Sequence, residues 1–220
     1  EDFLDEDSDF AFGVGMVNDR FSDEGEPAML LIVGDVTDPE VFGAIDEFRN
    51  NSDERIEGVK DKMTRKPDDT VDILAIDTFV FDAALSMLNN PVPFWDHGFN
   101  ESGCDRVGVL NAPDFDDRDC IVFFYGVLTL DGIPGTEVPS SLVDLYISPS
   151  ASPDPERVWL SEDGENISYD MMLIRIGITS PEDFPSMKPG MEKIKNDLSP
   201  FLNLSSGTWE EAGQAEEDMP

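Results

Sequence analysis

The chain has 220 residues, of which 49 are acidic and 14 are basic, so its formal net charge is −35. A charge of this size repels phosphate backbones and anionic lipid headgroups, which excludes nucleic acid as a partner. Salt at roughly 1 M shortens the Debye length to about 3 Å and screens such repulsion, so the composition indicates adaptation to a salty environment.

Apolar residues make up 40% of the chain, which is enough to form a buried core. The sequence contains no run of about 18 apolar residues, the length that a membrane-spanning helix needs. It begins at Glu1 with neither a methionine nor a signal peptide. We therefore expect this chain to be a fragment of a longer protein.

The first third of the chain predicts a helix, a strand and a second helix. An acidic lead-in precedes residues 10–21, in which apolar residues recur at helical spacing. Residues 29–33 are an unbroken apolar run, which predicts a strand that is buried on both faces. Thr37 or Asp38 is expected to cap a helix that begins at Pro39 and fades near residue 50.

The middle of the chain predicts one strong helix followed by an insertion. Residues 71–90 carry apolar residues over more than half a helical turn, so a helix buried on two sides is expected there. Residues 91–137 are rich in Gly, Pro and Asp and form the insertion. Within it, residues 120–130 (CIVFFYGVLTL) predict a buried strand, and residues 106–110 are a candidate second strand.

The last third predicts a hairpin and a helix. After a short helix at 142–147, residues 158–160 and 171–178 are expected to pair as a hairpin that turns at Asp163-Gly164. Residues 187–198 then predict a helix, and residues 201–204 a last short strand.

The order of these elements predicts an α+β domain of the ferredoxin-like, split βαβ type, with a long insertion between its first helix and its second strand. The expected core comprises residues 27–90 and 138–209. Residues 1–26 are a lead-in, residues 91–137 the insertion and residues 210–220 an acidic tail.

Cys104 and Cys120 are the two cysteines of the chain, with fifteen residues between them. In an oxidising exterior they would pair, and closing a loop of this length contributes about 3 kcal/mol in the chain-entropy model. The alternative is two free thiols that are buried separately.

Four N-x-Ser sequons make candidate glycosylation sites at Asn50, Asn100, Asn166 and Asn203. Sequons matter only on an exported surface, and chance occurrence in a polar chain is the alternative explanation.

Catalytic and metal-binding patterns are sparse. His97 is the single histidine and Cys104 follows seven residues later, so a Cys–His pair is conceivable; we favour a loop histidine beside a structural disulfide. The carboxylates of Asp114, Asp116, Asp117 and Asp119 are candidate calcium ligands, but their spacing fails the EF-hand pattern and a solvated acidic loop is favoured. No cofactor is implied.

Four segments carry a resemblance to a known family: DFLDEDS (2–8), GDVTDPEV (34–41), VWLSEDG (158–164) and MMLIRIGI (171–178). Together they resemble the first extracytoplasmic domain of the resistance–nodulation–division (RND) exporters, in the archaeal branch related to the MMPL exporters of hydrophobic compounds and lipids. Asp5 stands where that family commonly has proline, and residues 91–137 show no resemblance.

The resemblance implies a non-catalytic porter domain on the extracytoplasmic side of the membrane, within a multi-pass protein. Its partners would be the transmembrane helices and the second porter domain of the same longer chain, and its cargo hydrophobic or lipid-like. A homo-oligomer is compatible with the family, and both termini are expected to lie close together. The alternative is a free secreted, salt-adapted protein, either a carboxylate-based hydrolase or a surface adhesion module.

Overall fold

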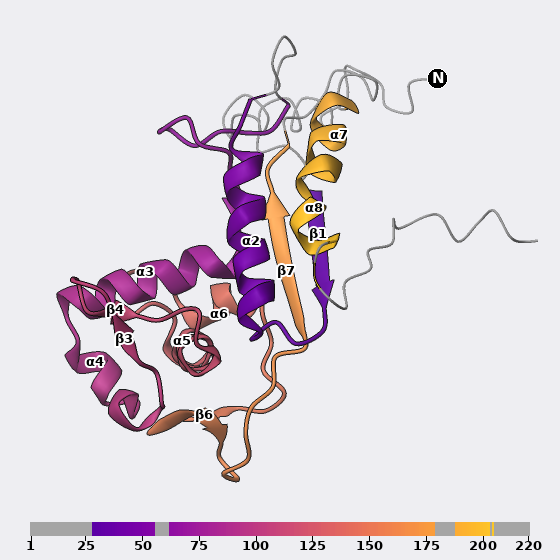
Figure 1. The fold of residues 1–220 in the computed structure, drawn as a ribbon. Helices are drawn as coiled ribbons and strands as arrows, with labels where there is room; N and C mark the ends of the chain where they lie inside the picture. The colour runs from indigo at the N-terminus through magenta and orange to yellow at the C-terminus, as the bar shows by residue number, and fades with distance from the viewer. Residues whose placement is uncertain (1–27, 56–61, 179–187, 203, 205–220) are drawn as a thin grey trace, which may run out of the picture.

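A computed structural model of the chain describes residues 28–55, 62–178, 188–202 and 204 (Figure 1). It combines antiparallel sheets with helices, which confirms the α+β class. The lead-in with its expected helix at 10–21, the acidic tail and both chain termini lie outside the described residues. None of the described helices is both long and apolar enough to cross a membrane.

The main sheet has three strands in the order β1 (Ala28–Val33), β7 (Met171–Ile176) and β2 (Ile73–Leu74). Strand β7 lies between the other two and is antiparallel to both, so β1 and β2 run in the same direction. The register places Leu30 opposite Ile174, on the face that is packed against the core. Two segments far apart in the sequence, at the beginning and near the end of the described chain, thus form one layer.

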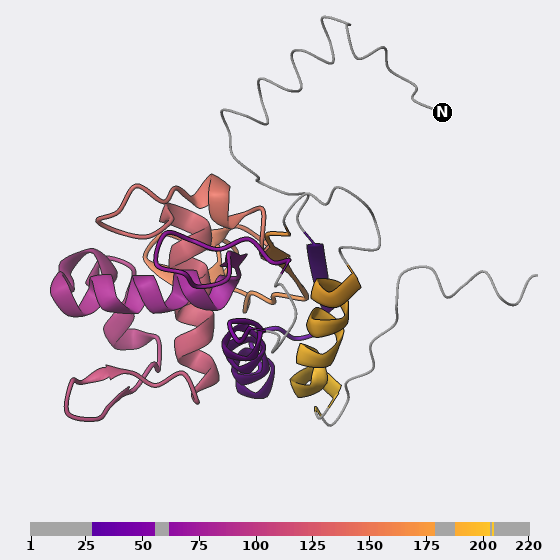
Figure 2. The same ribbon diagram turned by 90° about the horizontal axis from the view of Figure 1, so that it is seen from above.

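One side of this sheet is covered by helices α2 (Pro39–Ser52), α7 (Lys188–Asp197) and α8 (Ser199–Leu202). Figure 2 shows all three on the same side of β1 and β7. Helix α2 begins as predicted, because the Asp38 carboxylate accepts from the Glu40 amide and Pro39 occupies the first turn. At its other end, the Ser52 hydroxyl donates to Asp197 of α7 at 2.9 Å.

Two expectations about this layer are wrong. The strand expected at 201–204 is part of α8, a helical turn that continues almost directly from α7. Strand β1 is not buried on both faces: Met29, Leu31 and Val33 are 59–72% exposed, while the residues between them are half-buried. The apolar run hid this alternation because both faces of the strand carry apolar side chains.

The second part of the molecule is helical and is built around α5 (Arg118–Asp131), which packs against α3 (Ile76–Asn89). Figure 1 shows α5 end-on, beside α3. The strand predicted at 120–130 is therefore wrong. Eight residues of α5 are fully enclosed, and an apolar helix that is buried on every side lacks the 3.6-residue periodicity that would identify it. Its signals are at the ends, where Asp117 caps the first turn and Gly132 terminates the helix.

Short elements surround α5. Gly126 allows α5 to lie close to the backbone of Val158, because a Cβ at position 126 would lie 2.3 Å from the carbonyl oxygen of Val158. The remaining elements are α4 (Val92–Trp95), η1 (Phe99–Glu101), α6 (Ser140–Val143), and two hairpins formed by β3 (Arg106–Val107) with β4 (Ala112–Pro113) and by β5 (Pro153–Asp154) with β6 (Arg157–Ser161).

The turn predicted at Asp163-Gly164 forms, and Leu160 pairs with Asn166 across it. The hairpin expected between residues 158–160 and 171–178 does not form, although both segments contain strands. Strand β6 pairs with β5, its neighbour across a short turn, and β7 pairs with β1 and β2. The chain leaves the main sheet after β2, forms the helical part and returns to the sheet at β7. The sequence predicted this insertion before the second strand, whereas the structure has it after β2. One continuous hydrophobic core joins the two parts.

Candidate functional site

No described element covers the outer face of the main sheet, and most of the residues on this face are apolar. Arg175 of β7 lies on this face, opposite Met29. The apolar residues of β1 and β7 on it are Met29, Leu31 and Val33, with Met171 and Leu173 opposite Val33 and Leu31. The three β1 residues are 68%, 59% and 72% exposed. We call these five residues the open sheet face.

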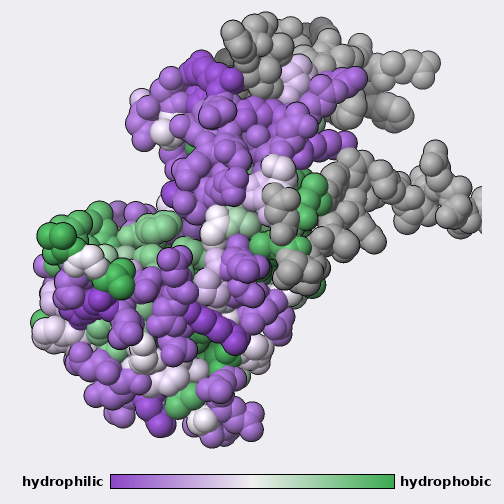
Figure 3. Space-filling model, viewed as in Figure 1, coloured by the Kyte–Doolittle hydropathy of each residue, from purple (hydrophilic) through white to green (hydrophobic). Residues whose placement is uncertain are grey.

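The open sheet face contrasts with the opposite, helix-covered side of the molecule. Hydrophilic residues cover most of the face seen in Figure 3, as the net charge of −35 leads one to expect. A row of exposed apolar side chains on β1, the edge strand of the described sheet, favours association with another surface, since both the apolar area and the strand edge gain from being covered. This surface is therefore the candidate functional site of the domain.

A second exposed apolar area lies at the far end of the helical part. In Figure 3 it is the green region at the left, over α3 and the β3–β4 hairpin. Its members are Leu85 and Leu88 of α3 and, in the hairpin, Val107, Val109 and Leu110.

The turn between β1 and α2 fixes the helical part against the sheet. Asp35 accepts from the backbone amide and the hydroxyl of Thr37, at 3.1 and 2.5 Å. Arg118, in the first turn of α5, donates from Nε to the Thr37 hydroxyl at 2.9 Å and pairs with Asp35, also at 2.9 Å. Thr37 is fully buried by these contacts. Residues of the GDVTDPEV segment thus hold α5 in place.

Two buried tyrosines complete this joint. The Tyr125 hydroxyl of α5 donates to the Val36 carbonyl at 3.1 Å, and the Val36 amide donates to the Tyr169 carbonyl. The two tyrosine rings meet edge to face with centroids 5.2 Å apart. Burial raises the pKa of both phenols above the ordinary value, so both stay neutral.

A buried carboxylate, which sequence reasoning missed, lies where α2 meets α3. Asp77 is completely buried, and its Oδ1 accepts from the Thr78 amide at 2.7 Å. Its Oδ2 lies 3.1 Å from Nε of Arg49, a charge contact without hydrogen-bond geometry. Burial raises the pKa of Asp77 to about 6, against the opposing effect of Arg49. The available signal was an acidic residue in the first turn of a largely apolar helix, in which Asp82 is the other acidic residue.

The structure joins Cys104 and Cys120 in a disulfide. The bond ties the segment after η1 to the first turn of α5. No thiol of the described chain is then free to act with His97. That ring is almost buried and bridges two elements instead: Nδ1 lies 2.9 Å from the Pro155 carbonyl, and Nε2 lies 2.8 Å from Asp131.

The acidic candidates for calcium do not converge on one point. Asp114 accepts from the Asp116 amide at 3.1 Å, and Asp117 accepts from the Asp119 amide at 3.0 Å as the cap of α5. In the part of the chain that the structure describes, no three acidic, histidine or cysteine side chains are placed to hold a metal ion. These carboxylates organise the entry into α5.

Three of the four sequon asparagines can be placed. Asn50 lies on α2, Asn100 in η1 and Asn166 in the segment after β6, and all three are exposed. Asn203 lies outside the described residues.

Comparison of the chain with models of protein families, with curated proteins and with solved structures finds no match.

The first prediction concerns the Tyr125 hydroxyl. Tyr125→Phe leaves the buried Val36 carbonyl without its partner, and we expect the free energy of unfolding to fall by about 1–2 kcal/mol. Tyr146→Phe is the matched control, because the hydroxyl of Tyr146 is equally buried but has no hydrogen-bond partner among the described residues. Urea denaturation of both variants in molar salt measures the difference. Equal losses in the two variants would mean that the joint does not depend on this bond.

The second prediction concerns the pH dependence that Asp77 causes. Its pKa is about 6 in the folded chain and near 3.8 when unfolded, so the folded state binds this proton more tightly. The ionised form therefore costs stability above pH 6, by about 3 kcal/mol at most, and this cost disappears as the pH falls toward 4.

Asp77→Asn removes this cost, so we expect the variant to be about 1–3 kcal/mol more stable than the wild type at pH 8. The difference should shrink to nearly zero at pH 4. Denaturation of both proteins across this pH range, at constant molar salt, gives the difference between their free energies of unfolding. The contributions of the other carboxylates cancel in this difference. A difference that stays constant with pH would show that Asp77 does not titrate as described.

Proposed function

We propose that this chain is the first extracytoplasmic porter domain of an RND/MMPL-type exporter, a non-catalytic domain that helps to form the path of hydrophobic or lipid-like substrates. The single observation that carries the proposal is the arrangement of the main sheet. Strands β1 and β2 are parallel, are joined through helix α2 and have β7 between them, an arrangement that fits a split βαβ layer. This is the ferredoxin-like logic that the resemblance to porter domains implies.

The open sheet face supports this proposal because a porter domain is one part of a larger assembly. Its proposed partner is the rest of the same longer chain, above all the second porter domain. Methionine and leucine make an adaptable apolar surface, suited to a contact that shifts as domains move. An uncovered apolar surface on so acidic a chain is explained if that surface is buried in the complete protein.

The resembling segments also occupy positions of structural consequence. GDVTDPEV forms the turn at the joint and the start of α2, and MMLIRIGI contains the central strand β7. The disulfide between Cys104 and Cys120 is in keeping with the oxidising side of a membrane.

The alternative, a secreted hydrolase, would require two facing carboxylates in a cleft, one with a raised pKa. Asp77 has the raised pKa but faces Arg49 and is closed off from solvent. Two pockets of about 220 and 160 Å³ on the described surface are each lined by a single acidic residue, Asp53 and Asp119 respectively. The geometry of the described residues thus favours the porter proposal over carboxylate catalysis.

The third prediction tests the open sheet face in the full-length gene product. Leu31→Glu places a charge at the centre of this face, and we expect export of a lipophilic dye from intact cells to fall at least tenfold. Burying an unpaired charge in an apolar contact costs more than the 1.4 kcal/mol to which this factor corresponds.

Leu85→Glu is the matched control, because Leu85 is 58% exposed against 59% for Leu31 but lies on α3 in the helical part. Equal amounts of both variants in the membrane fraction establish that both fold. Unchanged export by Leu31→Glu, or the same loss in both variants, would contradict the role of the open sheet face.

A further inference from the structure

The described sequons differ in the accessibility of their hydroxyl groups. In the sequon of Asn50, Ser52 is fully buried and bonded to Asp197. In the sequon of Asn100, Ser102 is 8% exposed and donates to the carbonyl of Phe99 at 2.8 Å. The hydroxyl that completes the motif is thus sequestered at both sites in the folded chain.

The sequon of Asn166 is accessible at both of its ends. Asn166 is exposed and pairs through its backbone with Leu160. Ser168 is half-exposed, and its hydroxyl donates to the exposed Asp170 carboxylate at 3.1 Å, a bond at the surface. The side-chain amide of Asn166 makes no hydrogen bond to any described residue. The amide of Asn50, in contrast, donates to Asp46 at 3.3 Å.

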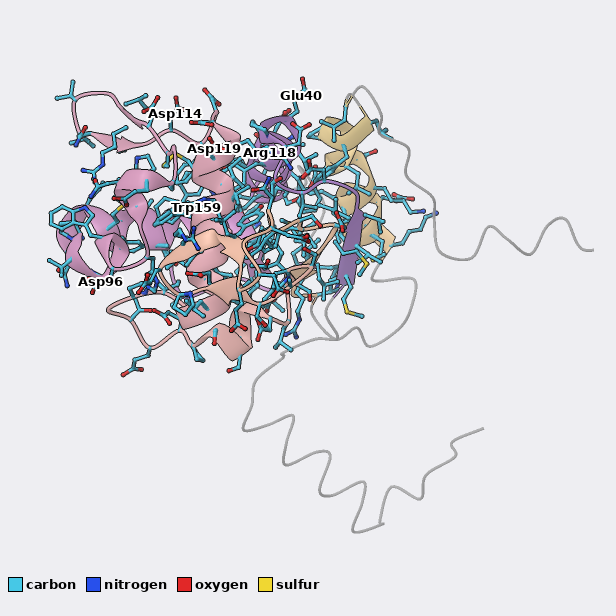
Figure 4. The ribbon with its side chains drawn as sticks, turned by 90° about the horizontal axis from the view of Figure 1, so that it is seen from below. Glu40, Asp96, Asp114, Arg118, Asp119 and Trp159 are labelled. Carbon is cyan, nitrogen blue, oxygen red and sulfur yellow. A yellow bond between two sulfur atoms is a disulfide. The ribbon has the colours of Figure 1, made fainter. Side chains whose placement is uncertain are left out.

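Asn166 also lies at the edge of a pocket of about 160 Å³, a volume comparable to one pyranose ring. Trp159 of β6 forms an aromatic wall, and Arg118 and Asp119 of α5 supply polar groups. Figure 4 shows Trp159 beside the first turn of α5, where Arg118 and Asp119 lie. An aromatic ring with a nearby donor and acceptor suits a sugar, which has apolar faces and hydroxyls at its rim.

The surroundings hold this pocket in shape. Arg118 is anchored through Nε and one terminal nitrogen to Thr37 and Asp35, which leaves its other terminal nitrogen available. The ring of Trp159 packs against Gly98, where a Cβ would lie only 3.0 Å from the ring carbon Cη2. The pocket is thus built from elements that are fixed for structural reasons.

We propose that Asn166 carries an N-linked glycan whose first sugar ring lies in this pocket, against Trp159. The donor is an oligosaccharide linked to a lipid phosphate. A bond forms between Nδ2 of Asn166 and C1 of the sugar, while the bond from C1 to the phosphate oxygen breaks. The lipid phosphate leaves with the electron pair, and the amide gives up a proton. The inference rests on the proposed function only in that the domain lies outside the cell membrane.

The fourth prediction is tested on the full-length protein purified from the cells that encode it. We expect mass spectrometry of unreduced peptides to find a sugar mass on Asn166 and none on Asn50 or Asn100. The same digest reports whether Cys104 and Cys120 are paired, which tests the compartment separately. A paired disulfide with bare Asn166 would overturn the glycan inference and leave the location standing. Free thiols with bare Asn166 would overturn both.

The position of the sugar is tested by the rate at which an endoglycosidase removes the glycan from the native protein. Trp159→Leu takes away the ring on which the first sugar rests. We therefore expect the endoglycosidase to remove the glycan at least ten times faster from this variant than from the wild type. Asp119→Asn, an exposed substitution in the same pocket, should give a smaller increase. Trp95→Leu is the control, because Trp95 is 47% exposed on α4 and does not line the pocket. Equal rates in all four proteins would show that the glycan does not rest on Trp159.

Discussion

The attachment of helix α5 to the turn after β1 is the constraint on which the rest of this structure depends. Tyr125 and Arg118 reach from α5 to the backbone of Val36 and to the side chains of Asp35 and Thr37. Since α3, α6 and β6 all pack against α5, these few contacts set the position of the whole helical part. They lie at the end of the sheet, and among the described residues no element covers the outer face of β1 and β7.

The predictions that succeeded depend on local signals. Helix α2 follows from Asp38 and Pro39, which act within one turn, and α7 follows from apolar residues that recur at helical spacing. Helix α5 was mistaken for a strand because its surroundings are apolar on every side, so no polar face marked its period. The open side of β1 was missed for a related reason, since apolar residues occupy both of its faces.

The sequence alone did not predict which distant segments pair with each other. Strand β7 pairs with β1 and β2 and not with β6, which is nearer in the sequence. This pairing depends on the packing of the whole core. The contact of Arg49 with Asp77 and the pocket of Trp159 with Asn166 likewise unite residues from different elements. The disulfide could be named because the chain has two cysteines, whereas the consequences of its position required the structure.

The central claim is that this domain belongs to a membrane exporter, and the most direct measurement is to sequence the gene on either side of the region that encodes it. We expect an apolar run of about 20 residues shortly before Glu1 and another soon after Pro220, each long enough to span the bilayer. A cleavable signal peptide before Glu1 and a stop codon after Pro220 would contradict the claim and make this a secreted protein.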